Sequence, residues 1–153
     1  MSTISVASLQ RITANKLSQL LLAEQAAATD PTVAVIDVRD DDYIGGHIKG
    51  SINVPSHTLD AMMPSLVRRL QDKKTVVFHC ALSQQRGPSA ALQYLRERDR
   101  LVKPEAGATE SDESDPNQLV YLLDRGFVGW QETYGEDERL TEGYNKELWK
   151  DGY

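Results

Sequence analysis

Residues 76–88 of the chain read Val76-Val77-Phe78-His79-Cys80-Ala81-Leu82-Ser83-Gln84-Gln85-Arg86-Gly87-Pro88. An apolar run leads into Cys80, the only cysteine of the protein, and Arg86 follows after five intervening residues. The apolar run is typical of a buried strand, and Pro88 fits the first turn of a helix, where no backbone N–H is needed. The stretch therefore predicts a strand, a tight loop that can hold an anion, and the start of a helix.

Other apolar runs of the chain extend this pattern. Residues 33–38 and 118–123 predict two more buried strands, and residues 9–12 and 51–55 predict short ones. Helices are expected over residues 14–27, 59–70, 88–98 and 127–134, the first of them capped by Thr13. Strands that alternate with helices in this way predict an α/β protein with a mainly parallel central sheet.

The remaining segments are polar. Residues 45–50 are rich in glycine and predict a turn, and residues 103–117 predict a polar loop with almost no apolar side chains. Residues 135–153 predict a tail that wraps the surface, with scattered aromatic side chains as anchors. A length of 153 residues suits one domain, so we expect residues 1–153 to form a single unit.

Composition argues against several kinds of partner. The net charge is −6, whereas binding to nucleic acid relies on clustered Lys and Arg. No apolar run approaches the roughly 20 residues that span a bilayer. The first ten residues lack a basic region followed by an apolar core, and a lone cysteine suits a reducing compartment. We therefore expect no nucleic acid and no membrane as partners, and a location in the cytoplasm, the nucleus or both.

The loop after the strand of residues 75–78 has the features of an oxyanion site. A loop between a parallel strand and a helix lies at the carboxyl end of the sheet, where open α/β folds bind ligands. Its backbone N–H groups can point inward and join the positive end of the helix dipole. Arg86 can hold two oxygens with its planar fork, and Gly87 lets the backbone approach closely. The predicted oxyanion loop comprises Ala81, Leu82, Ser83, Gln84, Gln85 and Arg86.

Cys80 is the candidate nucleophile of this site. The electrostatic field that favours an anion in the loop also favours the thiolate, which is the attacking form of cysteine. Taken alone, a single cysteine is more often a small buried apolar residue. Its occurrence with the five-residue spacing, Arg86 and the helix start favours the nucleophile. His79 is expected to face away from the cup and to support it by hydrogen bonds.

The proton donor for a leaving group is harder to identify. Asp40, Asp41 and Asp42 follow a strand at the same end of the sheet, so they are candidates for a general acid. The alternative is that they form a solvated acidic turn. Gln85 is neutral and cannot act as an acid. Asp37 lies within a strand and is expected to be a structural partner of an arginine or of backbone groups.

The chain resembles a known family. The pattern His79-Cys80-(five residues)-Arg86-Gly87-Pro88 is similar to the active-site signature of the mitotic-inducer dual-specificity phosphatases. It is also similar to that of the small eukaryotic phosphatases, fungal ones above all, and of arsenate reductases with the rhodanese fold. Two further regions resemble this fold: residues 35–39 with residues 46–55, and Gly126-Phe127 with Trp130. The resemblance covers about residues 12–134.

The resemblance implies a rhodanese-like fold, with a central, mainly parallel, five-stranded sheet flanked by helices. It implies a cysteine-dependent protein-tyrosine or dual-specificity phosphatase that forms a cysteinyl-phosphate intermediate on Cys80. The substrate would be a phosphorylated protein or another phosphate ester or oxyanion. Sulfurtransferases of this fold typically have one residue fewer between Cys and Arg, so the longer loop argues against sulfur transfer.

Two other activities and one binding role remain open. An arsenate reductase would use the same cup, but with one cysteine it would need glutathione and glutaredoxin as an external reductant. The lesser alternatives are a sulfurtransferase and a non-catalytic phosphate-binding module. No bound cofactor is expected. No metal site is expected either, because His47 and His57 lack a matching ligand spacing.

Overall fold

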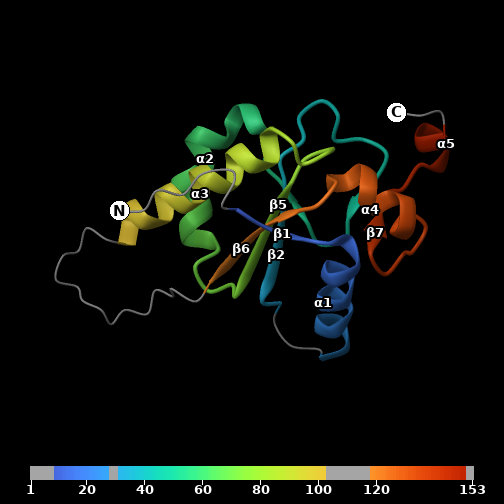
Figure 1. The fold of residues 1–153 in the computed structure, drawn as a ribbon, viewed down its shortest axis with the longest axis horizontal. Helices are drawn as coiled ribbons and strands as arrows, with labels where there is room; N and C mark the ends of the chain where they lie inside the picture. Colours follow the sequence, from blue (N-terminus) through green and yellow to red (C-terminus); the bar gives the residue numbers. More distant parts are fainter. Residues whose placement is uncertain (1–8, 28–30, 103–117, 151–153) are drawn as a thin grey trace.

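The computed structural model of the protein describes residues 9–27, 31–102 and 118–150. One sheet has the strand order β1-β6-β5-β2-β4, and every neighbouring pair in it is parallel. This sheet, drawn in Figure 1, confirms the predicted α/β class and the parallel five-stranded core. Its strands are β1 (Gln10–Ile12), β2 (Val33–Asp37), β4 (Ile52–Asn53), β5 (Thr75–His79) and β6 (Leu119–Leu123).

Helices cover both faces of the sheet (Figure 1). Val76 and Phe78 of β5 pack with α2 and α3 on one face, and Val77 packs with residues of α1 and α4 on the other. This alternation explains why β5 is apolar on both sides. Among the helices that the structure describes, none is long and apolar enough to cross a membrane. The helices are α1 (Ala14–Ala27), η2 (Ser56–Thr58), α2 (Leu59–Arg69), α3 (Arg86–Val102), α4 (Gly126–Tyr134) and α5 (Lys146–Lys150).

Two helix starts can be compared with their sequence signals. Thr13 caps α1 as predicted, because its Oγ1 accepts the N–H of Lys16 at 3.1 Å. Helix α3 begins at Arg86, two residues before the predicted start at Pro88, and extends beyond residue 98 to Val102. Pro88 is compatible with the first turn because the N–H groups there have no partner inside the helix. The earlier start makes Arg86 the first residue of α3.

A second, two-stranded sheet corrects the prediction for residues 45–50. This segment is not only a turn, because it contains β3 (His47–Ile48), which pairs antiparallel with β7 (Thr141–Glu142). The glycines at positions 45, 46 and 50 favour a turn, and the two residues of β3 are too few to reveal a strand between them. The described part of the tail thus adds a strand and α5 to the fold, and Trp149 packs against the core. The predicted loop at 103–117 and the last three residues of the tail lie outside the described residues.

Candidate active site

The loop after β5 closes around the sulfur of Cys80. Strand β5 ends at His79 and α3 begins at Arg86, so the loop lies at the carboxyl end of the sheet. Cys80 is 3% exposed. Its Sγ accepts hydrogen bonds from the N–H groups of Ser83 at 3.2 Å and Gly87 at 3.4 Å. Backbone donors therefore converge on the sulfur, as expected of a loop that stabilises negative charge.

The side chains of the predicted oxyanion loop contribute little to its interior. Leu82 is 47% exposed, and Gln84 and Gln85 are also exposed. Ser83 is buried in a left-handed conformation with φ of 58°, and its hydroxyl has no partner among the described residues. The interior of the cup is therefore built from backbone groups, as the anion-nest prediction requires.

Helix α4 holds the outer side of the loop. The N–H groups of Phe127 and Val128 donate to the carbonyl oxygens of Cys80 at 3.0 Å and Ala81 at 2.9 Å. These bonds direct both carbonyl groups toward the N-terminus of α4. Gly126 makes this approach possible, because a Cβ there would lie 2.5 Å from both carbonyl oxygens. Nothing in the local sequence around Gly126 connects it with the cysteine loop.

Gly87 has the close contacts that the sequence predicts. A Cβ at this position would lie 3.0 Å from Cδ1 of Leu122 and 3.4 Å from Cα of His79. The missing side chain thus lets the first turn of α3 pack closely against β5 and β6. This proximity also brings the N–H of Gly87 within reach of the sulfur of Cys80.

A buried charged cluster lies beneath the loop. Arg39 is fully buried, and its Nε and Nη2 donate to both carboxylate oxygens of Asp37 at 2.8–3.1 Å. Burial by itself would raise the pKa of Asp37, but the nearby His79 and the hydrogen bonds and charge of Arg39 hold it below the ordinary value. The expectation that Asp37 is a structural partner of an arginine is therefore confirmed.

His79 is buried behind the nucleophile. Its Nδ1 lies 3.0 Å from the carbonyl oxygen of Cys80, and its Nε2 lies 3.7 Å from Oδ2 of Asp37. Burial lowers the pKa of His79, although the charge of Asp37 opposes that shift. A carbonyl oxygen can only accept a hydrogen bond, so Nδ1 of His79 is the donor. His79 supports the loop through this bond and does not reach the cup.

Arg86 is held by the acidic loop, which we define as residues 40–46. Its Nη1 and Nη2 donate to the two carboxylate oxygens of Asp42 at 2.7 and 2.6 Å, and Nη1 lies 3.3 Å from Oδ2 of Asp40. The hydrogen bonds with Asp42 raise the pKa of Arg86 and lower the pKa of Asp42. The Nε of Arg86 has no hydrogen-bond partner among the described residues. The edge formed by Nε and Nη2 is therefore open to two oxygens of an oxyanion.

These contacts change the assignment of the acidic residues. Asp40 is desolvated, yet hydrogen bonds from Ser56, His57 and Arg86 hold its pKa below the ordinary value. Asp40 and Asp42 are therefore carboxylates at neutral pH, which is the wrong protonation state for a general acid. They are not a solvated acidic turn either, because both bind the guanidinium. Asp41 is exposed, and its role as a general acid remains a prediction.

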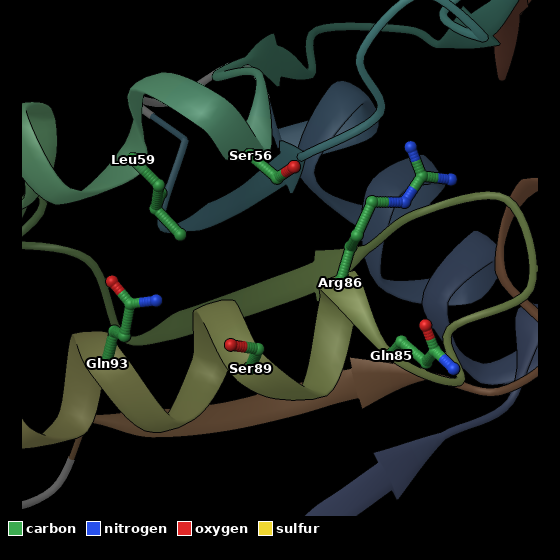
Figure 2. A pocket seen from close by; sticks show the side chains of 6 residues that line it. All are labelled: Ser56, Leu59, Gln85, Arg86, Ser89 and Gln93. Carbon is green, nitrogen blue, oxygen red and sulfur yellow. The ribbon is translucent and has the colours of Figure 1, made fainter.

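A pocket of about 270 Å³ adjoins this arginine (Figure 2). It lies between η2 and the start of α2 on one side and the first two turns of α3 on the other. Figure 2 shows the guanidinium of Arg86 at one end, directed away from Gln93 at the other. Apart from Arg86 the lining is uncharged, so the pocket suits the neutral part of a ligand. The lining residues are Ser56, Leu59, Gln85, Arg86, Ser89 and Gln93.

The comparison with known proteins agrees with this geometry. Residues 14–133 match the rhodanese-like domain. The chain belongs to the rhodanese-like family. It is 42% identical over 103 residues to arsenate reductase 2.2 of Oryza sativa subsp. japonica. The aligned region covers 67% of this chain and 72% of the relative. It is 37% identical over 126 residues to a CDC25-like phosphatase of Saccharomyces cerevisiae, and this aligned region covers 76% of this chain and 77% of the relative.

A solved structure supports the same family. Ygr203w, a yeast protein tyrosine phosphatase of the rhodanese family, superimposes on this rhodanese-like chain with a TM-score of 0.73 and 32% identity. The alignment covers 96% of this chain and 99% of the yeast chain. The predicted resemblance is thus confirmed: the relatives are named as phosphatases and as arsenate reductases. The catalytic roles of the individual residues remain predictions.

Two polar residues of the rhodanese-like chain that the sequence did not assign to the site contact Asp40. Ser56 donates to Oδ2 of Asp40 at 2.6 Å, and His57 contacts Oδ1 of the same carboxylate through both its backbone N–H and its Nδ1. From sequence, His57 is considered only as a metal ligand, and no metal site is expected there because a matching ligand spacing is missing. Within the described residues, no group of three or more His, Cys, Asp or Glu side chains is arranged to hold a metal ion.

Proposed function

We propose that this protein is a cysteine-dependent phosphatase of the protein-tyrosine or dual-specificity type, which acts on phosphorylated proteins or other phosphate esters. One observation carries the proposal: the sulfur of Cys80 accepts two backbone N–H bonds in the loop that ends at Arg86, whose Nε–Nη2 edge is open. Phosphoryl transfer needs a positioned nucleophile and fixed positive charge for the equatorial oxygens. The phosphatase names of two relatives support this choice.

The first chemical step forms a cysteinyl-phosphate. The thiolate of Cys80 attacks phosphorus in line with the leaving oxygen, so the S–P bond forms as the P–O bond breaks. The loop N–H groups and the open edge of Arg86 hold the three equatorial oxygens, where the transition-state charge lies. The leaving group departs with the electron pair of the P–O bond and takes up a proton.

The second step regenerates the enzyme. Water attacks the phosphorus of the cysteinyl-phosphate, and the S–P bond breaks with its electron pair returning to sulfur as thiolate. Inorganic phosphate leaves the same backbone cup. This cycle needs a reduced Cys80, so the cytoplasm, the nucleus or both are the compartments we propose for it.

Hydrolysis of p-nitrophenyl phosphate by three variants tests the proposal. Cys80→Ser is expected to abolish turnover, and Arg86→Ala to lower kcat/KM by about 100-fold or more, as for the loss of a charge-stabilising donor. Arg100→Ala is the matched control, because Arg100 lies exposed on the same helix and, among the described residues, its recorded ion pair is with Glu97. Full activity of Cys80→Ser would contradict the assignment of the nucleophile.

Arsenate reduction is the second candidate, and the 42% identity to a rice arsenate reductase favours it. Cys80 would displace one oxygen of arsenate to form a thiol–As(V) adduct. Glutathione would then attack the cysteine sulfur, so that an S–S bond forms and arsenic leaves with the S–As electron pair as arsenite. Because Cys80 is the only cysteine, a further external thiol must reduce the mixed disulfide. Arsenite formation that requires both glutathione and Cys80 would establish this activity.

A further inference from the structure

The phosphatase proposed above lacks an assigned proton donor for its leaving group. Without one, an alkoxide or a poorly stabilised phenolate leaves slowly. Asp40 and Asp42 are carboxylates committed to Arg86. Gln85, the last residue before the arginine, has no acidic proton. Asp41 remains a candidate, and a donor can also come from another element close to Arg86.

His57 lies on η2, beside Asp40 of the acidic loop. Its Nδ1 is 2.9 Å from Oδ1 of Asp40, and its backbone N–H donates to the same oxygen at 3.2 Å. The other oxygen of Asp40 accepts from the hydroxyl of Ser56 at 2.6 Å and from Nη1 of Arg86 at 3.3 Å. One carboxylate thus connects the imidazole with the guanidinium that is expected to hold the phosphoryl group.

The partner of Nδ1 determines what the second nitrogen can do. An ionised carboxylate can only accept hydrogen bonds, so Nδ1 of His57 must carry the proton of this bond. The side chain of His57 is 68% exposed, and Nε2 has no hydrogen-bond partner among the described residues. Nε2 is therefore the nitrogen that gains and loses a proton. An imidazole held by a carboxylate in this way is a common arrangement for acid–base catalysis.

The leaving oxygen is expected opposite the sulfur. In-line attack by the buried sulfur of Cys80 places the leaving oxygen on the far side of phosphorus. The pocket beside Arg86 can take the rest of the substrate, and Ser56 lines it. His57 follows Ser56 directly in the chain, and its imidazole contacts Asp40, which also contacts Arg86.

We propose that His57 is the general acid of the first step and the general base of the second. Protonated Nε2 gives its proton to the leaving oxygen as the P–O bond breaks, and an alcohol leaves. Neutral Nε2 then takes a proton from the attacking water as the S–P bond breaks, which restores the imidazolium and the thiolate. This inference rests on the proposed phosphatase activity. The charged groups recorded around His57 are Asp40, from the acidic loop, and through it Arg86, from α3.

A leaving-group series distinguishes a proton donor from a structural residue. For His57→Gln we expect kcat/KM on phenyl phosphate, which reports the steps up to departure of the leaving group, to fall by about 100-fold, within the range of general acid catalysis. With p-nitrophenyl phosphate, whose phenolate leaves without a proton, we expect kcat/KM to change by less than about threefold because no acid is needed in that step.

His47→Gln is the matched control. His47 is a half-buried histidine beside a carboxylate, Glu142, at 3.1 Å, and no contact of this pair with Arg86 is recorded among the described residues. This control should hydrolyse both esters at the wild-type rate. An equal loss of kcat/KM on both esters in His57→Gln, or no loss on either, would overturn the role of His57. It would leave the phosphatase proposal standing. Failure of the wild type to hydrolyse any aryl phosphate would overturn the phosphatase proposal and this inference together.

Discussion

Arg86 and Asp42 face each other end to end, with Nη1–Oδ1 and Nη2–Oδ2 distances of 2.7 and 2.6 Å. This two-point contact fixes the plane of the guanidinium, because the fork of arginine matches a carboxylate in one orientation. It also uses only the terminal nitrogens, so the Nε edge remains for a ligand. The carboxylate therefore fixes the guanidinium and leaves Nε without a hydrogen-bond partner among the described residues.

Removal of this orienting charge should weaken oxyanion binding. In Asp42→Asn the guanidinium loses its bidentate partner and becomes free to rotate, so we expect the inhibition constant of inorganic phosphate to rise by about tenfold, as for one lost charged hydrogen bond. Product inhibition of p-nitrophenyl phosphate hydrolysis measures this constant. Asp99→Asn, at an exposed position on α3, is the control. Tighter phosphate binding in Asp42→Asn would mean that Asp42 competes with the ligand.

The C-terminal strap, residues 141–150, holds the acidic loop from the other side. The Nε1 of Trp149 donates to the carbonyl oxygen of Gly45 at 2.9 Å, and the N–H of Asn145 donates to the same oxygen at 3.2 Å. Trp149→Phe removes one of these bonds and keeps an aromatic ring near Phe127. Loss of a neutral hydrogen bond costs about 1 kcal/mol, so we expect Tm to fall by about 2–4 °C.

The matched control for the strap is Lys146→Ala. Lys146 pairs with Glu136, and both side chains are more than 60% exposed, 68% and 67%. Surface pairs of this kind contribute little to stability, so Tm should stay within about 1 °C of the wild type. Equal Tm values for Trp149→Phe and Lys146→Ala would show that the Gly45 contact does not stabilise the fold.

The sequence predicts the parts of this molecule whose signals are local. Long apolar runs identify β2, β5 and β6, and the spacing from Cys80 to Arg86 identifies the loop, because each pattern lies within one short stretch. The pairing of β3 with β7 joins His47 to Glu142, and neither strand lies in an apolar run that the sequence could reveal. The contacts of Gly126 with the loop, and of His57 with Asp40, depend on which segments the sheet order brings together. Such contacts follow from topology and not from composition.

The buried pair Asp37–Arg39 should be essential for stability. Asp37→Asn leaves the fully buried guanidinium of Arg39 without its counter-charge, which costs about 3–5 kcal/mol. Urea unfolding at pH 7 measures this loss. The control is Asp124→Asn at the exposed pair with Arg11, where about 1 kcal/mol or less is expected. Similar losses for both variants would contradict the importance of burial.

The same variant should change the response to acid. The pKa of Asp37 is lower in the folded state than its ordinary value of 3.8, so the unfolded chain binds the proton more readily. Its contribution to stability is therefore complete well above that value and is lost as the pH falls through the folded pKa. Between pH 5 and 3 the urea midpoint of the wild type should fall more steeply than that of Asp37→Asn. Parallel curves would show that other carboxylates dominate the acid response.

Gly126→Ala tests whether α4 shapes the nucleophile loop. Gly126 has a φ of 55°, and an added Cβ would lie 2.5 Å from the carbonyl oxygens of Cys80 and Ala81. These are backbone atoms, so the loop itself must move, and its N–H groups must move with it.

Gly143→Ala separates this clash from simple strain: its φ is 65°, but its Cβ would meet only Cα of Gly46, at 3.9 Å. Both variants should lose about 1–2 kcal/mol from the left-handed backbone. Only Gly126→Ala should also lose about tenfold or more in kcat/KM, because a displacement near 1 Å disturbs a reacting geometry strongly. Equal kcat/KM values for the two variants would mean that α4 does not set the position of Cys80.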